Sequence, residues 1–66
     1  MTDLPIINVQ MMEGRDPDKI ETLMKNLTET VSETLGAPKE NVRVLVNEVP
    51  KTHWSIGGTS AKELRK

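Results

Sequence analysis

The chain has 66 residues, and its nine Lys and Arg residues are matched by ten Asp and Glu residues, which gives a formal net charge of −1. This length allows a single domain, residues 1–66, that buries only about 60% of its unfolded surface. The chain has no cysteine and one histidine, so disulfides and clusters of metal-binding Cys and His are excluded, and oligomerisation is the expected means of stabilisation.

The same composition disfavours several classes of function. Nucleic acid binding is not expected, because the charge is nearly balanced and Trp54 is the one aromatic residue able to stack on a base. A membrane protein is not expected, because no apolar run approaches the roughly 20 residues of a membrane span. The N-terminus lacks the charged and then apolar pattern of a secretory signal. We therefore expect a cytoplasmic protein without a metal or other cofactor.

Residues 5–12, PIINVQMM, are predicted to form the first strand, after an N-terminal extension of residues 1–4. Apolar side chains at alternate positions of this strand share one face, and the residues between them fall on the other face. The stretch EGRDPDK then ends the alternation, and Gly14 within it indicates a turn.

Residues 16–35 are predicted to form a helix. Asp16 is a good N-cap, and Pro17 suits the first helical position. Gly36 stands where the helix is expected to stop, with Pro38 two residues later. The apolar residues recur at spacings of three and four, which is typical of an amphipathic helix: Ile20, Leu23, Met24, Leu27, Val31 and Leu35.

The second strand is predicted for residues 42–49, VRVLVNEV, in which the valines alternate with larger or polar residues. Pro50 is expected to end this strand, because proline cannot donate to a strand ladder. The remaining segment, residues 50–66, contains Gly57 and Gly58, which favour a tight hairpin-like turn before a short polar end.

This order of elements predicts an α/β (α+β) fold built on one β-α-β unit. A helix of about 19 residues spans roughly 28 Å, and eight strand residues span about 26 Å. The helix can therefore carry the chain back, and the two strands are expected to run parallel. The helix covers one face of the sheet, so partner subunits are expected to cover the other, because two strands alone are marginally stable.

Four stretches of the chain are together similar to a known family. They are the Pro5-Ile6 start, the EGR that ends at Arg15, the VRV that contains Arg43, and the HWSIGG from His53 to Gly58. In this order they resemble the 4-oxalocrotonate tautomerase family of small β-α-β enzymes, and the resemblance extends over residues 5–66. It implies a homohexamer, a trimer of dimers, in which the open sheet faces and the C-terminal segments are buried between subunits.

The resemblance also implies an isomerase, a tautomerase of the kind that acts in the breakdown of aromatic compounds. In that family an N-terminal proline with a free amine takes a proton from a dienol or 2-hydroxydienoate, a small carboxylate substrate, and returns it two or four atoms away. Carried over to this chain, Pro5 is the catalytic base and Arg15 and Arg43 bind the anionic groups, with Arg43 also catalytic. Trp54 completes the substrate-binding site, where the family usually has phenylalanine.

Physical chemistry is consistent with these roles. A group that moves a proton along a conjugated acid must be both base and acid, which requires a pKa near the working pH. Neighbouring arginines and an apolar surround lower the pKa of an amine, because they disfavour its charged form. The arginines also bind carboxylates and stabilise charge on a dienolate. Pro5 and Arg15 are separated by the first strand, about 25 Å, so a site that uses both must be assembled across subunits.

The chain departs from the family pattern at its start, because Leu4 and the residues before it precede Pro5. Within a peptide bond the Pro5 nitrogen has no basic lone pair. One interpretation is a later start, since leucine codons such as TTG can initiate translation in bacteria, and removal of an initiator at Leu4 would free Pro5. The alternative is that the extension is genuine and that the protein is a non-enzymatic, oligomeric anion-binding protein.

Simpler interpretations exist for several of these residues. Arg43 and Arg15 can be exposed strand and turn residues, and Trp54 can anchor a subunit interface. His53 is expected to be structural or exposed, because there is no second histidine to join it in a metal site or a catalytic triad. A related reaction, the hydration or dehalogenation of an unsaturated acid, is disfavoured because Ile56 stands where the additional carboxylate is expected.

Overall fold

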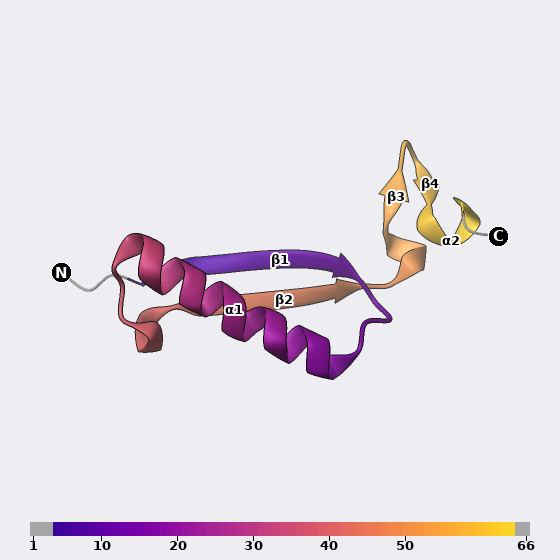
Figure 1. Cartoon of the computed structure of the whole chain (residues 1–66). Coiled ribbons are helices and arrows are strands. Elements are labelled where there is room, and N and C mark those ends of the chain that lie inside the picture. Colours follow the sequence, from indigo (N-terminus) through magenta and orange to yellow (C-terminus); the bar gives the residue numbers. More distant parts are fainter. Residues whose placement is uncertain (1–3, 65–66) are drawn as a thin grey trace.

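Two long strands and one long helix form the body of the chain (Figure 1). The computed structural model describes residues 4–64. Strand β1 (Ile6–Met12) and strand β2 (Arg43–Val49) pair in parallel, and helix α1 (Pro17–Leu35) connects them. The predicted β-α-β unit with parallel strands is therefore confirmed. Each strand begins one residue later than the sequence indicates.

The two faces of the β1–β2 sheet differ in exposure. In the register, Ile7 pairs with Val44 and Val9 pairs with Val46, and these side chains are half-buried on the face that α1 covers. The other face is open, and the side chains that alternate with them are exposed. On this open face the side-chain amide of Asn47 donates a hydrogen bond of 2.9 Å to Gln10 Oε1. The alternation in the sequence thus corresponds to one covered face and one open face.

Both ends of α1 are set by residues that the sequence indicated. Asp16 is the N-cap in an extended conformation, and its Oδ1 accepts a hydrogen bond of 2.9 Å from the Asp18 backbone N–H. At the other end Gly36 adopts a left-handed φ of 74°, and its N–H donates to the Ser32 carbonyl oxygen at 2.9 Å. A left-handed C-cap of this kind is strongly favoured by glycine.

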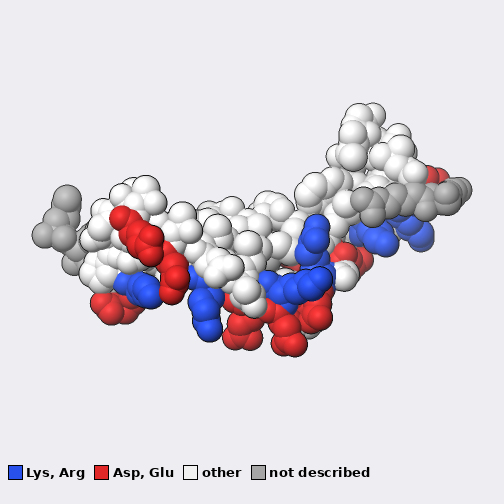
Figure 2. Space-filling view, viewed as in Figure 1, with Lys and Arg blue, Asp and Glu red and all other residues white. Residues whose placement is uncertain are grey.

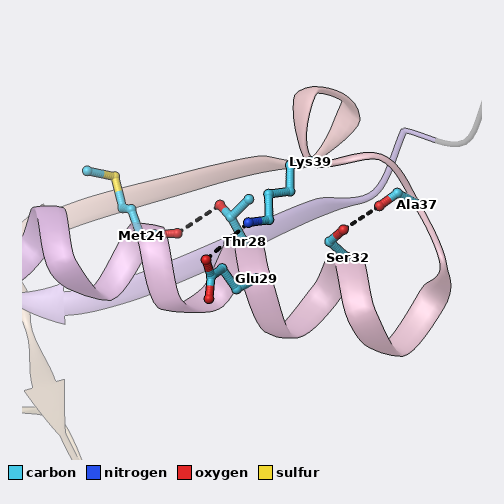
Figure 3. Close-up of polar contacts among 6 residues, drawn as sticks. All are labelled: Met24, Thr28, Glu29, Ser32, Ala37 and Lys39. Atoms are coloured by element: carbon cyan, nitrogen blue, oxygen red, sulfur yellow. Dashed lines mark hydrogen bonds and ion pairs between the residues drawn. The ribbon is translucent and has the colours of Figure 1, made fainter.

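A short connection leads from α1 to β2, and a hydrogen bond and an ion pair hold it against the helix (Figure 3). The Ser32 hydroxyl donates a hydrogen bond of 2.6 Å to the Ala37 carbonyl oxygen. Lys39 Nζ lies 3.1 Å from Glu29 Oε1, and Lys39 begins the short 3-10 helix η1 (Lys39–Asn41). Ala37 is buried, with 3% of its surface exposed. Nothing in the sequence predicted η1, because its geometry depends on these contacts with α1.

The C-terminal part of the chain projects beyond the carboxyl ends of the strands (Figure 1). It consists of the 3-10 turn η2 (Lys51–His53), the antiparallel pair of β3 (Ser55–Ile56) and β4 (Thr59–Ser60), and the helical turn α2 (Ala61–Leu64). The hairpin was expected, but the short polar end was not expected to be helical. The Ala61 N–H donates a hydrogen bond of 2.6 Å to the Trp54 carbonyl oxygen, which folds α2 back onto the hairpin. Arg65 and Lys66 lie outside the described residues.

Residues 4–64 bury few side chains completely and do not enclose a core of their own. The chain's radius of gyration is 15.3 Å, against about 11 Å for a compact domain of this length. Its accessible surface is 5195 Å², whereas a compact monomer of this mass exposes about 4,200 Å². Ala37, Val42 and Ala61 are the hydrophobic residues buried among those described. Large apolar side chains are exposed instead: Leu4, Ile6, Leu35, Leu45, Ile56 and Leu64.

The charged side chains are distributed unevenly over the surface. In Figure 2 they gather along the side that carries α1, whereas the side of the strands is largely uncharged. Within residues 4–64 no helix combines the length and the apolar character required to cross a membrane. The open sheet face combines the exposed apolar side chains of Ile6 and Leu45 with the polar side chains of Asn8, Gln10 and Asn47.

Candidate active site

Pro5 and Arg43 lie beside each other at the amino ends of the two parallel strands. The Arg43 backbone N–H donates a hydrogen bond of 3.0 Å to the Pro5 carbonyl oxygen. Arg43 is the register partner of Ile6, so both side chains leave the sheet on its open face. The side chains of Ile6 and Arg43 are both exposed, whereas Pro5 is half-buried. The fold thus brings the expected base and one expected anion-binding residue to the same end of one subunit.

The Arg43 side chain is oriented by the turn that precedes β2. Its Nη1 donates a hydrogen bond of 2.7 Å to the Glu40 carbonyl oxygen. Glu40 belongs to η1, which the Lys39–Glu29 ion pair joins to α1 (Figure 3). Within the described part of the chain, Arg43 forms no ion pair. Because a guanidinium carries five N–H donors, donors remain for a carboxylate or a dienolate oxygen.

Arg15 lies beyond the carboxyl end of the same sheet. The Glu13 N–H donates a hydrogen bond of 3.0 Å to the Val49 carbonyl oxygen, and Gly14 then turns the chain with a φ of 109°. Few residues other than glycine tolerate such a backbone conformation. The seven residues of β1 separate this end from Pro5 by about 23 Å. Within one subunit Arg15 therefore does not reach Pro5.

Two clefts that share Arg15 and Lys19 open at this end. The larger has a volume of about 470 Å³ and is lined by Met12, Glu13, Gly14, Arg15, Asp16, Lys19 and Lys51. The smaller, of about 370 Å³, lies between β1 and α1 and is lined by Val9, Gln10, Met11, Arg15, Lys19, Ile20 and Leu23. Arg15 thus sits where a mainly apolar cleft and a charged cleft meet.

Trp54 is also at the carboxyl end of the sheet, directly after η2. It is half-buried, and its carbonyl oxygen is the acceptor for Ala61. Its side chain does not line either of the two clefts at Arg15. The neighbouring His53 is exposed, with Nδ1 at 3.4 Å from Thr52 Oγ1. No three His, Cys, Asp or Glu residues in the described range are grouped so that they could hold a metal ion.

Three contributors to these two ends were not indicated by the sequence. They are Lys19, Lys51 and the Glu40 carbonyl oxygen. A backbone carbonyl has no signature in a sequence, and a lysine in a polar stretch is usually a solvated residue. The helical spacing rule gives no signal for Lys19, because Arg15 precedes the N-cap Asp16 and does not belong to α1.

The sequence model of the tautomerase enzymes matches residues 5–64, which is nearly the whole chain. The chain belongs to the tautomerase family. A 2-hydroxymuconate tautomerase of Stutzerimonas stutzeri is 43% identical to this tautomerase over 61 residues, which are 92% of this chain and 97% of the relative. The resemblance that the sequence indicated is therefore confirmed.

Solved structures agree with the fold of this tautomerase. TomN, a 4-oxalocrotonate tautomerase homologue in the tomaymycin biosynthetic pathway, matches with a TM-score of 0.88 and 46% identity over 92% of this chain and 94% of its own. A heterohexameric 4-oxalocrotonate tautomerase from Chloroflexus aurantiacus J-10-fl matches with a TM-score of 0.86 and 34% identity. That match covers 94% of this tautomerase and 100% of the Chloroflexus chain.

Proposed function

We propose that this tautomerase isomerises a small unsaturated 2-hydroxy or 2-oxo acid and that a free Pro5 amine is its acid and base. The observation that carries the proposal is the family match, which begins at Pro5. The 43% identity to a 2-hydroxymuconate tautomerase supports a dienol that carries carboxylates as the substrate.

The proposed reaction moves one proton and rearranges the double bonds of the substrate. The Pro5 nitrogen accepts the proton of the 2-hydroxyl group, the C2–O bond becomes a carbonyl, and the double bonds shift along the carbon chain. Pro5 then returns the same proton to carbon 3 or carbon 5. Atoms and electrons balance without an oxidant, a reductant or a further reactant. Negative charge develops on the dienolate oxygen, where the unused donors of Arg43 stabilise it.

The proposed site is shared between subunits of a homohexamer, a trimer of dimers. Two features of the subunit support this assembly. Pro5 and Arg43 lie at one end of the sheet, while Arg15 and Trp54 lie at the other. The open sheet face exposes apolar side chains such as Leu45, which is 53% exposed. In the assembly Arg15 binds the carboxylate remote from the proton transfer, and Trp54 forms an apolar wall.

The proposal is tested by the turnover of 2-hydroxymuconate, followed through its ultraviolet absorbance. The protein is prepared so that it begins at Pro5, and the rate is compared with that of the uncatalysed conversion in buffer. We expect saturable acceleration that is lost when Arg43 is replaced by alanine and retained when Lys25, which is exposed on α1, is replaced by glutamine. An assembled protein that does not accelerate this conversion, or that of the monocarboxylate 2-hydroxy-2,4-pentadienoate, would overturn the proposal.

A further inference from the structure

We infer that Lys19 is a specificity-determining residue that, together with Arg15, selects substrates with a carboxylate at the end remote from the proton transfer. The inference rests on the proposed function only for the identity of the site. The clefts, the charges and the position of Lys19 are properties of the described subunit.

Lys19 is placed beside Arg15 by the first turn of α1. Its backbone N–H donates a hydrogen bond of 3.0 Å to the carbonyl oxygen of the N-cap Asp16, which fixes it within the first helical turn. Arg15 directly precedes that cap. The two side chains border both clefts at this end of the sheet, so a group that enters either cleft meets both cations.

Within residues 4–64 neither Lys19 nor Arg15 forms an ion pair. In the larger cleft the carboxylates of Glu13 and Asp16 offset part of the positive charge of Arg15, Lys19 and Lys51. The smaller cleft contains no acidic residue at all, and its charged residues are Arg15 and Lys19. In the smaller cleft both cations are therefore available to an anionic ligand.

The walls of the smaller cleft indicate the chemistry of that ligand. Val9, Met11, Ile20 and Leu23 provide apolar surface, and the two cations lie together on its lining. An apolar conjugated chain that ends in a carboxylate matches both the apolar walls and the two cations, whereas a chain with an apolar end leaves the cations without a partner. A second cation about 6 Å from the carboxylate, at an effective dielectric constant of about 40 to 80, strengthens binding about three- to tenfold.

The test measures binding rather than turnover and uses the full chain. Muconate and sorbate have the same six-carbon conjugated skeleton, but muconate carries a second carboxylate at the distal end. Neither has a hydroxyl group, so neither reacts. Dissociation constants are measured by calorimetry at low ionic strength, where surface electrostatics are least screened. We expect muconate to bind more tightly than sorbate. Lys19→Gln should weaken the binding of muconate about three- to tenfold and change the binding of sorbate less than about twofold.

Three further variants separate a specific role from a structural one. Lys19→Arg keeps the charge and should restore the preference for muconate. Lys25→Gln removes a lysine that belongs to the same helix but lines neither cleft. It should leave the dissociation constants of both ligands unchanged. Lys51→Gln should have a smaller effect than Lys19→Gln, because Lys51 lines only the larger cleft. Equal weakening of both ligands by Lys19→Gln, an unchanged preference, or failure of the parent chain to bind muconate would each overturn the inference.

These outcomes are distinct from those that decide the proposed function. Muconate binding that depends on Lys19, without turnover of 2-hydroxymuconate by the form that begins at Pro5, would uphold the anion selectivity and remove the enzymatic role. Turnover with a muconate preference that does not depend on Lys19 would uphold the enzyme and remove Lys19 from its specificity.

Discussion

The backbone N–H of Arg43 donates a hydrogen bond of 3.0 Å to the carbonyl oxygen of Pro5. This bond engages the carbonyl of Pro5 and leaves its nitrogen outside the strand ladder, since proline has no N–H to contribute within a chain. A free amine at Pro5 is therefore compatible with the observed pairing of β1 and β2. The same bond brings a guanidinium-bearing residue next to the residue proposed as the base.

The first prediction concerns the Pro5 nitrogen. A chain with Met1–Leu4 attached should be a much poorer tautomerase than a chain that begins at Pro5, because the peptide bond delocalises the nitrogen lone pair. Both forms are prepared, their masses are verified, and enol-to-ketone conversion is compared between pH 5 and 9. Equal kcat/KM with the same pH profile would show that Pro5 is not the base.

The second prediction concerns the guanidinium of Arg43. Arg43→Ala removes donors from the developing dienolate oxygen and should lower kcat by about 10² to 10³, as found when a single oxyanion donor is removed. Arg43→Lys should recover only part of this loss, because an ammonium group does not reproduce the planar fork of donors. The measurement is steady-state kinetics on 2-hydroxymuconate at matched oligomer concentration. Full turnover by Arg43→Ala would remove Arg43 from the mechanism.

The third prediction concerns the open face of the sheet. Leu45→Lys should break the assembly, because a charge would be buried at a subunit interface without a partner. Sedimentation should show the parent protein as six chains of 7.4 kDa each and the variant as smaller species. Asn26→Lys introduces the same side chain at an exposed position of α1 and is the matched control. A stable folded monomer of the parent chain would contradict both the hexamer and the shared site.

The fourth prediction concerns the turn of the C-terminal hairpin. Gly57 and Gly58 have φ values of 62° and 91°, and a type I′ hairpin turn requires positive φ at both central positions. An added Cβ at Gly57 meets no atom within 4 Å, so the cost of a substitution is backbone strain and not a clash. Gly57→Val should therefore destabilise the protein by about 1–2 kcal/mol, whereas Gly57→Asn should be nearly neutral because Asn-Gly is a preferred pair in this turn.

The measurement for this pair is chemical unfolding at a fixed protomer concentration, because the stability of an oligomer depends on concentration. Equal losses of stability in Gly57→Val and Gly57→Asn would indicate that the hairpin turn is not constrained by its φ values.

The locally determined parts of this fold were predictable from the sequence. The alternation in β1 and the three- and four-residue spacing in α1 follow from the geometry of each element. Asp16 and Gly36 act on backbone groups within a few residues of themselves, so their capping roles needed no knowledge of the rest of the chain. The combined motifs around Pro5, Arg15, Arg43 and Trp54 indicated the tautomerase family, which the match over residues 5–64 confirmed.

The tertiary structure decided what depends on contacts between distant segments. The helical turn α2 forms where Ala61 is buried and hydrogen-bonded to Trp54. The sequence of residues 60–66 by itself indicated only a polar end. The orientation of Arg43 depends on the Glu40 carbonyl, and the role inferred for Lys19 depends on its placement beside Arg15 by the turn into α1. The sequence by itself thus determined the elements and the family, because these follow from local backbone preferences and side-chain types. The hydrogen bond between Pro5 and Arg43 and the surroundings of Arg15 were decided only by the folded chain, because hydrogen bonds and clefts between remote residues exist only once their register is set.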